Sequence, residues 1–197
     1  MPNWCFTKIT INHWDQRGLE RLDALLDEWT SKDYKENGFG LEWLGNIVGN
    51  SGIGTITEEG KATYSCRGRM TYKDLADNQL LIDTETAWSP MLKMWIALVE
   101  RYLPDAEIIY TADECGCGLY CTNDPTLENC YIIDSWDIDE VESDWEASEK
   151  TVIKTLQKLL NSKKRKIDAL LKEFEDSEYS DGMSINKWDF EPITVWE

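Results

Sequence analysis

Apolar and polar residues alternate over residues 79–87, and this alternation predicts a half-buried β-strand. One face of the predicted strand carries Leu80, Ile82, Thr84 and Thr86. Ser89 and Pro90 follow as the N-cap and first residue of a predicted helix, which Pro104 ends. The buried stripe of that helix recurs every three or four residues, at Leu92, Trp95, Ile96, Val99, Tyr102 and Leu103. Residues 106–111 predict the next strand.

The same two patterns, alternation and a repeat every three or four residues, predict the elements before this stretch. Residues 5–13 alternate as a strand, and residues 18–29 follow the spacing of an amphipathic helix. Residues 32–54 show neither pattern, so we predict a long ordered insertion there, which could carry one helical turn. Residues 61–72 predict extended chain. The order of strand, helix, hairpin, helix and strand predicts an α+β fold: a ferredoxin-like antiparallel sheet with two helices on one face.

The composition changes at residue 134, so we predict a ferredoxin-like domain over residues 1–133 and a helical extension over 134–197. Residues 134–149, the acidic segment, carry eight acidic side chains and no basic one. Ser143 and Glu146 match a capping box and predict that a helix starts there. That helix either continues to about residue 176 or breaks into a hairpin near Asn161. Its apolar stripe could be a homodimer seam. The apolar tail is expected to fold back onto the protein.

The chain is strongly acidic, with 38 acidic and 20 basic residues among 197 and a net charge of −18. This charge argues against direct non-specific binding of nucleic acid or of anionic membranes, because both require lysine and arginine. No apolar run approaches the length of a membrane span, and the N-terminus lacks a signal-peptide pattern, so we expect a cytoplasmic protein with reduced thiols. An acidic protein is steered toward basic surfaces.

The acidic segment is therefore the leading candidate for a partner-binding surface. Its carboxylates would enter a groove lined with lysine and arginine, and its tryptophans would supply desolvated anchors. The predicted partner-binding residues are Asp134, Trp136, Asp137, Asp139, Glu140, Glu142, Asp144 and Trp145. The alternative interpretation is that these charges only form a solvated face.

Two other groups of residues suggest ligand chemistry. Four cysteines could supply the thiolates of a tetrahedral zinc site, at Cys115, Cys117, Cys121 and Cys130. The alternative is a hairpin with small buried thiols and no cofactor. Arg67, Arg69 and Trp88 could bind a small anion, although the arginines could instead pair with nearby acids. His13 is the single histidine, and no sequence motif of a known catalytic centre is present.

Two stretches resemble the YubB-type ferredoxin-like family of phage and plasmid proteins. The first is MPNWC at residues 1–5, and the second is TETAWSP at residues 84–90. The resemblance covers roughly residues 1–121. Residues 66–71 stand where the family has a Trp-Gly-Thr-Lys-Trp-Asp stretch, so that motif is absent here. The resemblance implies a ferredoxin-like fold and an origin in a mobile element, and it implies no enzymatic activity.

These observations lead to one functional hypothesis with two alternatives. We expect a non-catalytic accessory protein of a phage or plasmid that inhibits a host defence complex in the bacterial cytoplasm. The expected partner is a CRISPR effector, which would make the chain an anti-CRISPR that mimics nucleic acid. The first alternative is a small-molecule or zinc-binding module. The second is a nuclease that uses clustered carboxylates and a divalent metal.

Overall fold

The computed structural model describes residues 3–35, 39–57, 59 and 61–196, and it has an α+β architecture. The chain divides into two compact units. Unit 1 comprises residues 1–123 and 191–197, and unit 2 comprises residues 124–190. The division at Asn123 falls ten residues before the boundary that we predicted from the change in composition. No helix in the described residues is long and apolar enough to cross a membrane.

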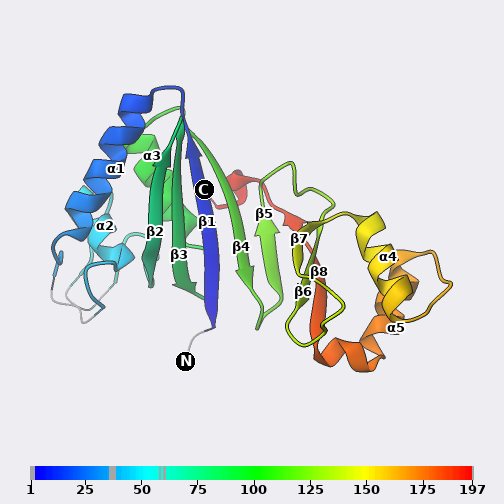
Figure 1. Ribbon diagram of the computed structural model, residues 1–197. Helices are drawn as coiled ribbons and strands as arrows, with labels where there is room; N and C mark the ends of the chain where they lie inside the picture. The colour runs from blue at the N-terminus through cyan, green and yellow to red at the C-terminus, as the bar shows by residue number, and fades with distance from the viewer. Residues whose placement is uncertain (1–2, 36–38, 58, 60, 197) are drawn as a thin grey trace. The chain divides into compact units, whose positions relative to one another are not determined.

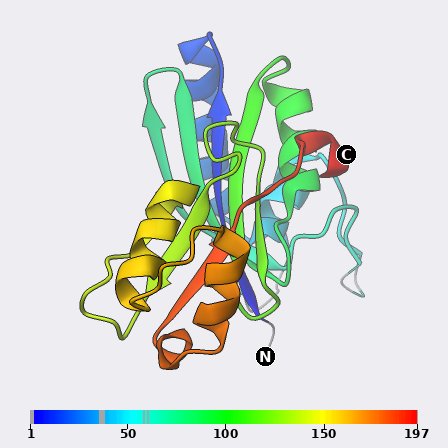
Figure 2. The ribbon, with the colours of Figure 1, turned by 90° about the vertical axis from the view of Figure 1, so that its right-hand side faces the viewer.

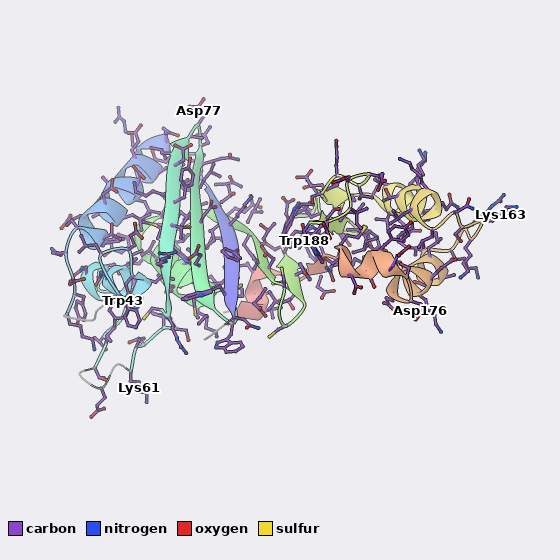
Figure 3. All side chains as sticks on the ribbon, turned by 60° about the horizontal axis from the view of Figure 1, so that its bottom comes forward. Trp43, Lys61, Asp77, Lys163, Asp176 and Trp188 are labelled. Carbon is purple, nitrogen blue, oxygen red and sulfur yellow. The ribbon has the colours of Figure 1, made fainter. Side chains whose placement is uncertain are left out.

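Unit 1 is built on an antiparallel sheet in which the strands lie in the order β2-β3-β1-β4-β5. The strands are β1 (Trp4–Asn12), β2 (Gly68–Ala76), β3 (Gln79–Ala87), β4 (Glu107–Glu114) and β5 (Leu119–Thr122). The helices are α1 (Gln16–Thr30), α2 (Leu44–Ser51) and α3 (Leu92–Tyr102). Figure 1 shows the three helices gathered on one side of the sheet. Asp77 marks the turn between β2 and β3 (Figure 3).

Alternation along the strands decides which face of the sheet meets the helices. In β1 the side chains of Cys5, Thr7, Ile9 and Ile11 are buried, and in β3 those of Leu80, Ile82, Thr84 and Thr86 are buried. The opposite face of β1 leaves Trp4 and Phe6 about half exposed. The strand and the buried face that we predicted for residues 79–87 are therefore confirmed.

The predicted apolar stripe of α3 is incomplete. Leu92, Trp95 and Val99 are buried as predicted, but so are Met94 and Leu98, which lie beside the stripe. The helix begins at Leu92 and has no side-chain cap, so the N-cap predicted at Ser89 is wrong. Ser89 lies in a bend before the helix, where its carbonyl accepts a hydrogen bond from the Thr86 hydroxyl at 2.8 Å, and Met91 takes the N-cap position instead.

The insertion at residues 32–54 holds more than one helical turn. All but two residues of α2 are buried, and this all-round burial explains why the sequence shows no amphipathic period there. Buried Asn46 organises the preceding loop. Its amide oxygen accepts a hydrogen bond from the Tyr34 N–H at 3.0 Å, and its amide nitrogen donates to the Leu41 and Gly40 carbonyls at 3.0 and 3.2 Å.

Unit 2 contains a three-stranded antiparallel sheet in the order β7-β6-β8 and a pair of helices. The elements are β6 (Tyr131–Ser135), β7 (Asp144–Ala147), α4 (Glu149–Leu159), α5 (Ile167–Glu175), the 3-10 helix η1 (Glu178–Asp181), β8 (Met183–Lys187) and β9 (Asp189–Phe190). Figure 2 shows α4 and α5 side by side, and Lys163 lies in their connection (Figure 3). Val152, Leu156, Leu170 and Phe174 are buried in the core of this unit.

Several predictions for this region need correction. The helix predicted to start at Ser143 starts at Glu149, where the Ser148 hydroxyl caps it by accepting the Thr151 N–H at 3.2 Å. Residues 144–147 form strand β7 instead. Of the two predicted forms, the hairpin is confirmed and the single long helix is wrong. The apolar residues on which a dimer seam would depend lie in the core of unit 2.

The end of the tail, from Glu191, belongs to unit 1, and the residues before it belong to unit 2. The Glu191 N–H donates to the Thr122 carbonyl at 2.8 Å, and the Tyr110 hydroxyl donates to the Glu191 carbonyl at 3.1 Å. Ile193, in the 3-10 helix η2 (Ile193–Trp196), packs against the core of unit 1.

Candidate functional site

The acidic segment runs through the end of β6, a loop, β7 and the start of α4, all in unit 2. Its loop is fixed to the beginning of β8, because the N–H groups of Trp136 and Asp137 both donate to the Gly182 carbonyl at 3.0 Å. A Cβ atom at residue 182 would lie 2.7 Å from Cδ1 of Ile138, so a larger residue there would require the Ile138 side chain to shift. The loop is therefore held in one conformation by its own backbone contacts.

Four of the predicted acidic residues come together around a hollow of about 730 Å³. They are Asp139, Glu140, Glu142 and Asp144. Val141, Leu159 and Tyr179 supply apolar and aromatic lining, and Lys158 is the one basic residue in the lining. Among the described residues, no salt bridge joins any of the four acids to a lysine or arginine. Their charge is left available to a cationic partner.

Trp136 and Trp145 are exposed, and both are held in place. Trp136 is 58% exposed, and its indole N–H donates to the Asp181 carbonyl at 3.2 Å. Trp145 is 40% exposed and lies with its ring centroid 6.4 Å from that of buried Trp188. The Trp188 indole N–H donates to the Trp145 carbonyl at 2.9 Å. Both indoles therefore offer apolar area that costs little ordering on binding.

The remaining acidic residues of the prediction are placed differently. Asp134 is half-buried in β6, where its carboxylate accepts a hydrogen bond from the Ser143 hydroxyl at 3.4 Å. Asp137 is exposed beside Gly182 and does not line the hollow. Neither Trp136 nor Trp145 lines it either. The structure thus supports a carboxylate cluster with two separate aromatic anchors.

The four cysteines of the predicted zinc site are not gathered. Cys115 and Cys117 lie exposed in the turn between β4 and β5, Cys121 is buried in β5, and Cys130 belongs to unit 2. Strand β4 ends at Glu114, so the strand geometry that would aim Cys115 and Cys117 the same way does not occur. Within the described ranges, no group of three or more histidine, cysteine or acidic side chains is close enough to hold a metal ion.

The turn that carries the two exposed cysteines is closed by Glu114. Its carboxylate accepts the Gly116 and Cys117 N–H groups at 2.9 and 2.7 Å. The Cys117 thiol, together with these N–H groups, lowers the pKa of Glu114 below its ordinary value. The same hydrogen bond to Glu114, with burial, raises the pKa of the Cys117 thiol. Cys117 is therefore poorly prepared to act as a thiolate ligand or nucleophile.

Arg67, Arg69 and Trp88 do come together, in unit 1. They line a second hollow, of about 700 Å³. Arg69 pairs with an acid, as one alternative predicted: its Nε and Nη2 donate to Oε2 of Glu85 at 2.8 and 2.6 Å. Arg67 makes no salt bridge within the part of the chain that the structure describes.

The sequence prediction missed most of the lining of this second hollow. Trp4, Phe39, Trp43, Tyr64 and Met91 also line it. Phe39 and Trp43 come from the aperiodic insertion, so no local pattern marked them. The nearest signal was the abundance of tryptophan, which did not show where the rings would meet.

His13 has a structural role in the turn between β1 and α1. Its Nδ1 accepts the Asp15 N–H at 3.1 Å, and Asp15 in turn caps α1 by accepting the Arg17 N–H at 3.1 Å. These contacts place His13 at the N-terminal cap of α1.

Comparison with known proteins adds no relative: no family model matches the chain, and neither a curated protein nor a solved structure matches it.

Proposed function

We propose that the chain is a non-catalytic binding protein whose acidic segment occupies a lysine- and arginine-rich surface of a nucleic-acid-binding partner. The observation that carries the proposal is the cluster of four carboxylates around the hollow in unit 2, which make no salt bridge among the described residues. Two exposed tryptophans flank them in sequence and are held in place by hydrogen bonds and ring contacts. Charge would steer the encounter, and the indoles would supply desolvated contact area.

The chemistry favours a basic protein over nucleic acid as the partner. A chain of net charge −18 repels phosphate backbones, and the acidic segment contains no basic residue that could neutralise a phosphate. The lysine-rich connection between α4 and α5 is the strongest local exception, but Lys164 there is paired with Glu173 at 3.0 Å. The groove of a protein that normally holds DNA or RNA offers the complementary charge.

The biological setting rests on the resemblance of residues 1–5 and 84–90 to the YubB-type family. We infer a ferredoxin-like fold for unit 1, supported by the antiparallel order β2-β3-β1-β4 and by α1 and α3, which connect the strand pairs. An origin in a phage or plasmid makes a host defence complex the natural target. Of these complexes, a CRISPR effector presents the long cationic groove that the acidic segment would fill.

The test compares two variants that have the same net charge. In the first, five acids of the segment become amides: D137N, D139N, E140Q, E142Q and D144N. In the control, five exposed acids of unit 1 become amides: E20Q, E28Q, D74N, D77N and E100Q. Both variants have a net charge of −13, so a difference between them reports position rather than total charge.

Each protein is titrated against purified CRISPR effectors loaded with guide RNA, at about 0.05 and 0.5 M salt. Over this range the Debye length falls from roughly 14 to 4 Å. We expect wild type and the unit 1 control to bind and to block target DNA, and we expect the segment variant to associate more slowly. High salt should reproduce the effect of the segment variant. Equal affinities of the two variants, independent of salt, would refute the role of the acidic segment.

A further inference from the structure

We infer that unit 1 carries a separate binding site, the aromatic hollow, for a small anion that has a planar base, of the nucleoside monophosphate class. The hollow measures about 700 Å³, which lies within the usual range for a small-molecule site. Its lining combines five aromatic side chains with two arginines: Trp4, Phe39, Trp43, Tyr64, Trp88, Arg67 and Arg69. The proposed action of the acidic segment does not involve any of these residues.

One wall of the aromatic hollow is built by the insertion. The ring centroids of Phe39 and Trp43 lie 5.6 Å apart in a stacked pair. Trp43 pairs with Arg69 across an isolated β-bridge, and the Met70 N–H donates to the Glu42 carbonyl at 3.0 Å. These bonds attach the start of α2, where Trp43 lies (Figure 3), to the outer strand of the sheet. Buried Asn46 also donates to the Gly40 and Leu41 carbonyls beside this wall, so these protein contacts hold the wall without a ligand.

Trp88 is another part of the lining, and it has an unusual backbone. Its φ angle is +73°, in the left-handed region that bulky residues rarely adopt. Hydrogen bonds on both sides hold it there: the Trp88 N–H donates to the Asn3 carbonyl at 3.0 Å, and the Ala87 N–H donates to the Arg67 carbonyl at 2.9 Å. Such conformations concentrate at binding sites, where the surrounding structure imposes them. In Trp88 this backbone conformation occurs at a residue whose indole is half exposed and lines the hollow.

The charges of the hollow select an anion. The Arg69 charge is balanced by Glu85, and the two groups bond through Nε and Nη2, so Nη1 of Arg69 lies outside that bond. Arg67 has no acidic partner in the described residues. Arg67 is exposed and lines the hollow, so its guanidinium is accessible to a ligand there. A phosphate accepts two parallel hydrogen bonds from such a group.

The aromatic walls specify the rest of the ligand. Indole, phenol and phenyl faces stack on nucleobases without requiring a particular base. One unbalanced arginine suits a single phosphate, whereas a longer nucleic acid would bring more negative charge than the site and the acidic chain can neutralise. A cationic ligand is disfavoured by the two guanidinium groups. A nucleoside monophosphate has one nucleobase, which can stack on the aromatic walls, and one phosphate, which matches the charge.

The experiment is isothermal titration of the full-length protein with AMP, GMP, CMP and UMP, with the matching nucleosides as a second arm. We expect wild type to bind at least one monophosphate, and we expect the matching nucleoside to bind at least tenfold more weakly. Arg67→Gln should weaken monophosphate binding at least tenfold, because it removes the unbalanced charge and keeps the rings. Arg21→Gln, at an exposed arginine of α1, is the matched control and should bind as wild type.

Two further measurements keep the result interpretable. Thermal unfolding of Arg67→Gln should match wild type, because Arg67 is exposed and its side chain makes no salt bridge to the described residues. A short single-stranded oligonucleotide should bind no more tightly than the best monophosphate. The inference is overturned if no monophosphate binds at millimolar concentration, if Arg67→Gln binds as wild type, or if the oligonucleotide binds more tightly than every monophosphate.

Discussion

Trp95→Ala is the sharpest test of the core of unit 1. Trp95 is 1% exposed in the middle of α3, among residues from the sheet and from the other helices. A buried aromatic side chain removes about 150–250 Å² from water, which at about 25 cal/mol per Å² corresponds to about 4–6 kcal/mol. Truncations of this kind cost about 3–5 kcal/mol, because the neighbours relax only in part. At about 3 °C per kcal/mol, the melting temperature of unit 1 should fall by about 9–15 °C.

The assay must separate the two units, so thermal unfolding is combined with hydrogen exchange resolved by peptide. Trp95→Ala should reduce the protection of β1, β3 and α3, while β6 and β8 remain protected. Phe174→Ala is the matched control, because Phe174 is a buried aromatic residue in the core of unit 2. It should reduce protection in β6 and β8 and leave unit 1 unchanged.

Two results would refute this account of the core. A melting temperature of Trp95→Ala within about 2 °C of wild type would show that the indole is not packed as described. Equal loss of protection in both units from either substitution would show that the units do not have separate cores.

Three further predictions concern the turns and caps. Replacing Cys115 and Cys117 by serine, or adding a chelator, should leave the melting temperature nearly unchanged, and unfolding on chelation would instead indicate a structural metal. Glu114→Gln should speed alkylation of Cys117 at pH 8, because the carboxylate raises the pKa of that thiol. Since the folded pKa of Glu114 is lowered, the stability it supplies at neutral pH is lost as pH falls toward that value, and Glu114→Gln should flatten this acid dependence in unfolding titrations. Ser148→Ala should destabilise unit 2 by about 1 kcal/mol in urea unfolding, and no change would contradict its role as the N-cap of α4.

Periodic stretches of the sequence predicted several elements of unit 1, because each of these has one buried and one exposed face. Strands β1 and β3 and helix α1 follow that rule closely. The rule fails for α2, where burial on nearly every side removes the period that an amphipathic helix would show.

The capping box at Ser143 failed for a different physical reason. Its hydroxyl accepts the Ser135 N–H at 3.0 Å across the β6–β7 pair, and the Glu146 N–H donates to the Asp144 carboxylate at 3.0 Å. Tertiary and local partners therefore took the groups that a helix cap would have used. A four-residue motif cannot show this competition, because Ser135 is eight residues away in the sequence.

The two candidate sites differ in how far the sequence alone could predict them. The acidic segment was predictable because its charges are contiguous in the chain. The aromatic hollow was only partly predictable, because Trp4, Trp43 and Trp88 come from three separated segments that meet only in the folded unit. Arg67 and Arg69 could be identified as candidates from the sequence, but their different pairing depends on which of them lies beside Glu85 in the sheet.

The chain passes between the two units twice, at points that are neighbours in unit 1. The chain leaves unit 1 after Asn123 and re-enters at Glu191, and the backbone of Glu191 is bonded to that of Thr122 at 2.8 Å. Unit 2 is thus a cassette whose two junctions are neighbours, so excision with a short linker keeps strands β1–β5 and the returning tail. Simple truncation at Asn123 is the harsher change, because it removes the acceptor of the Tyr110 hydroxyl and the apolar cover of Ile193. Chimeras that exchange the cassette between scaffolds are therefore feasible without redesign of the host sheet.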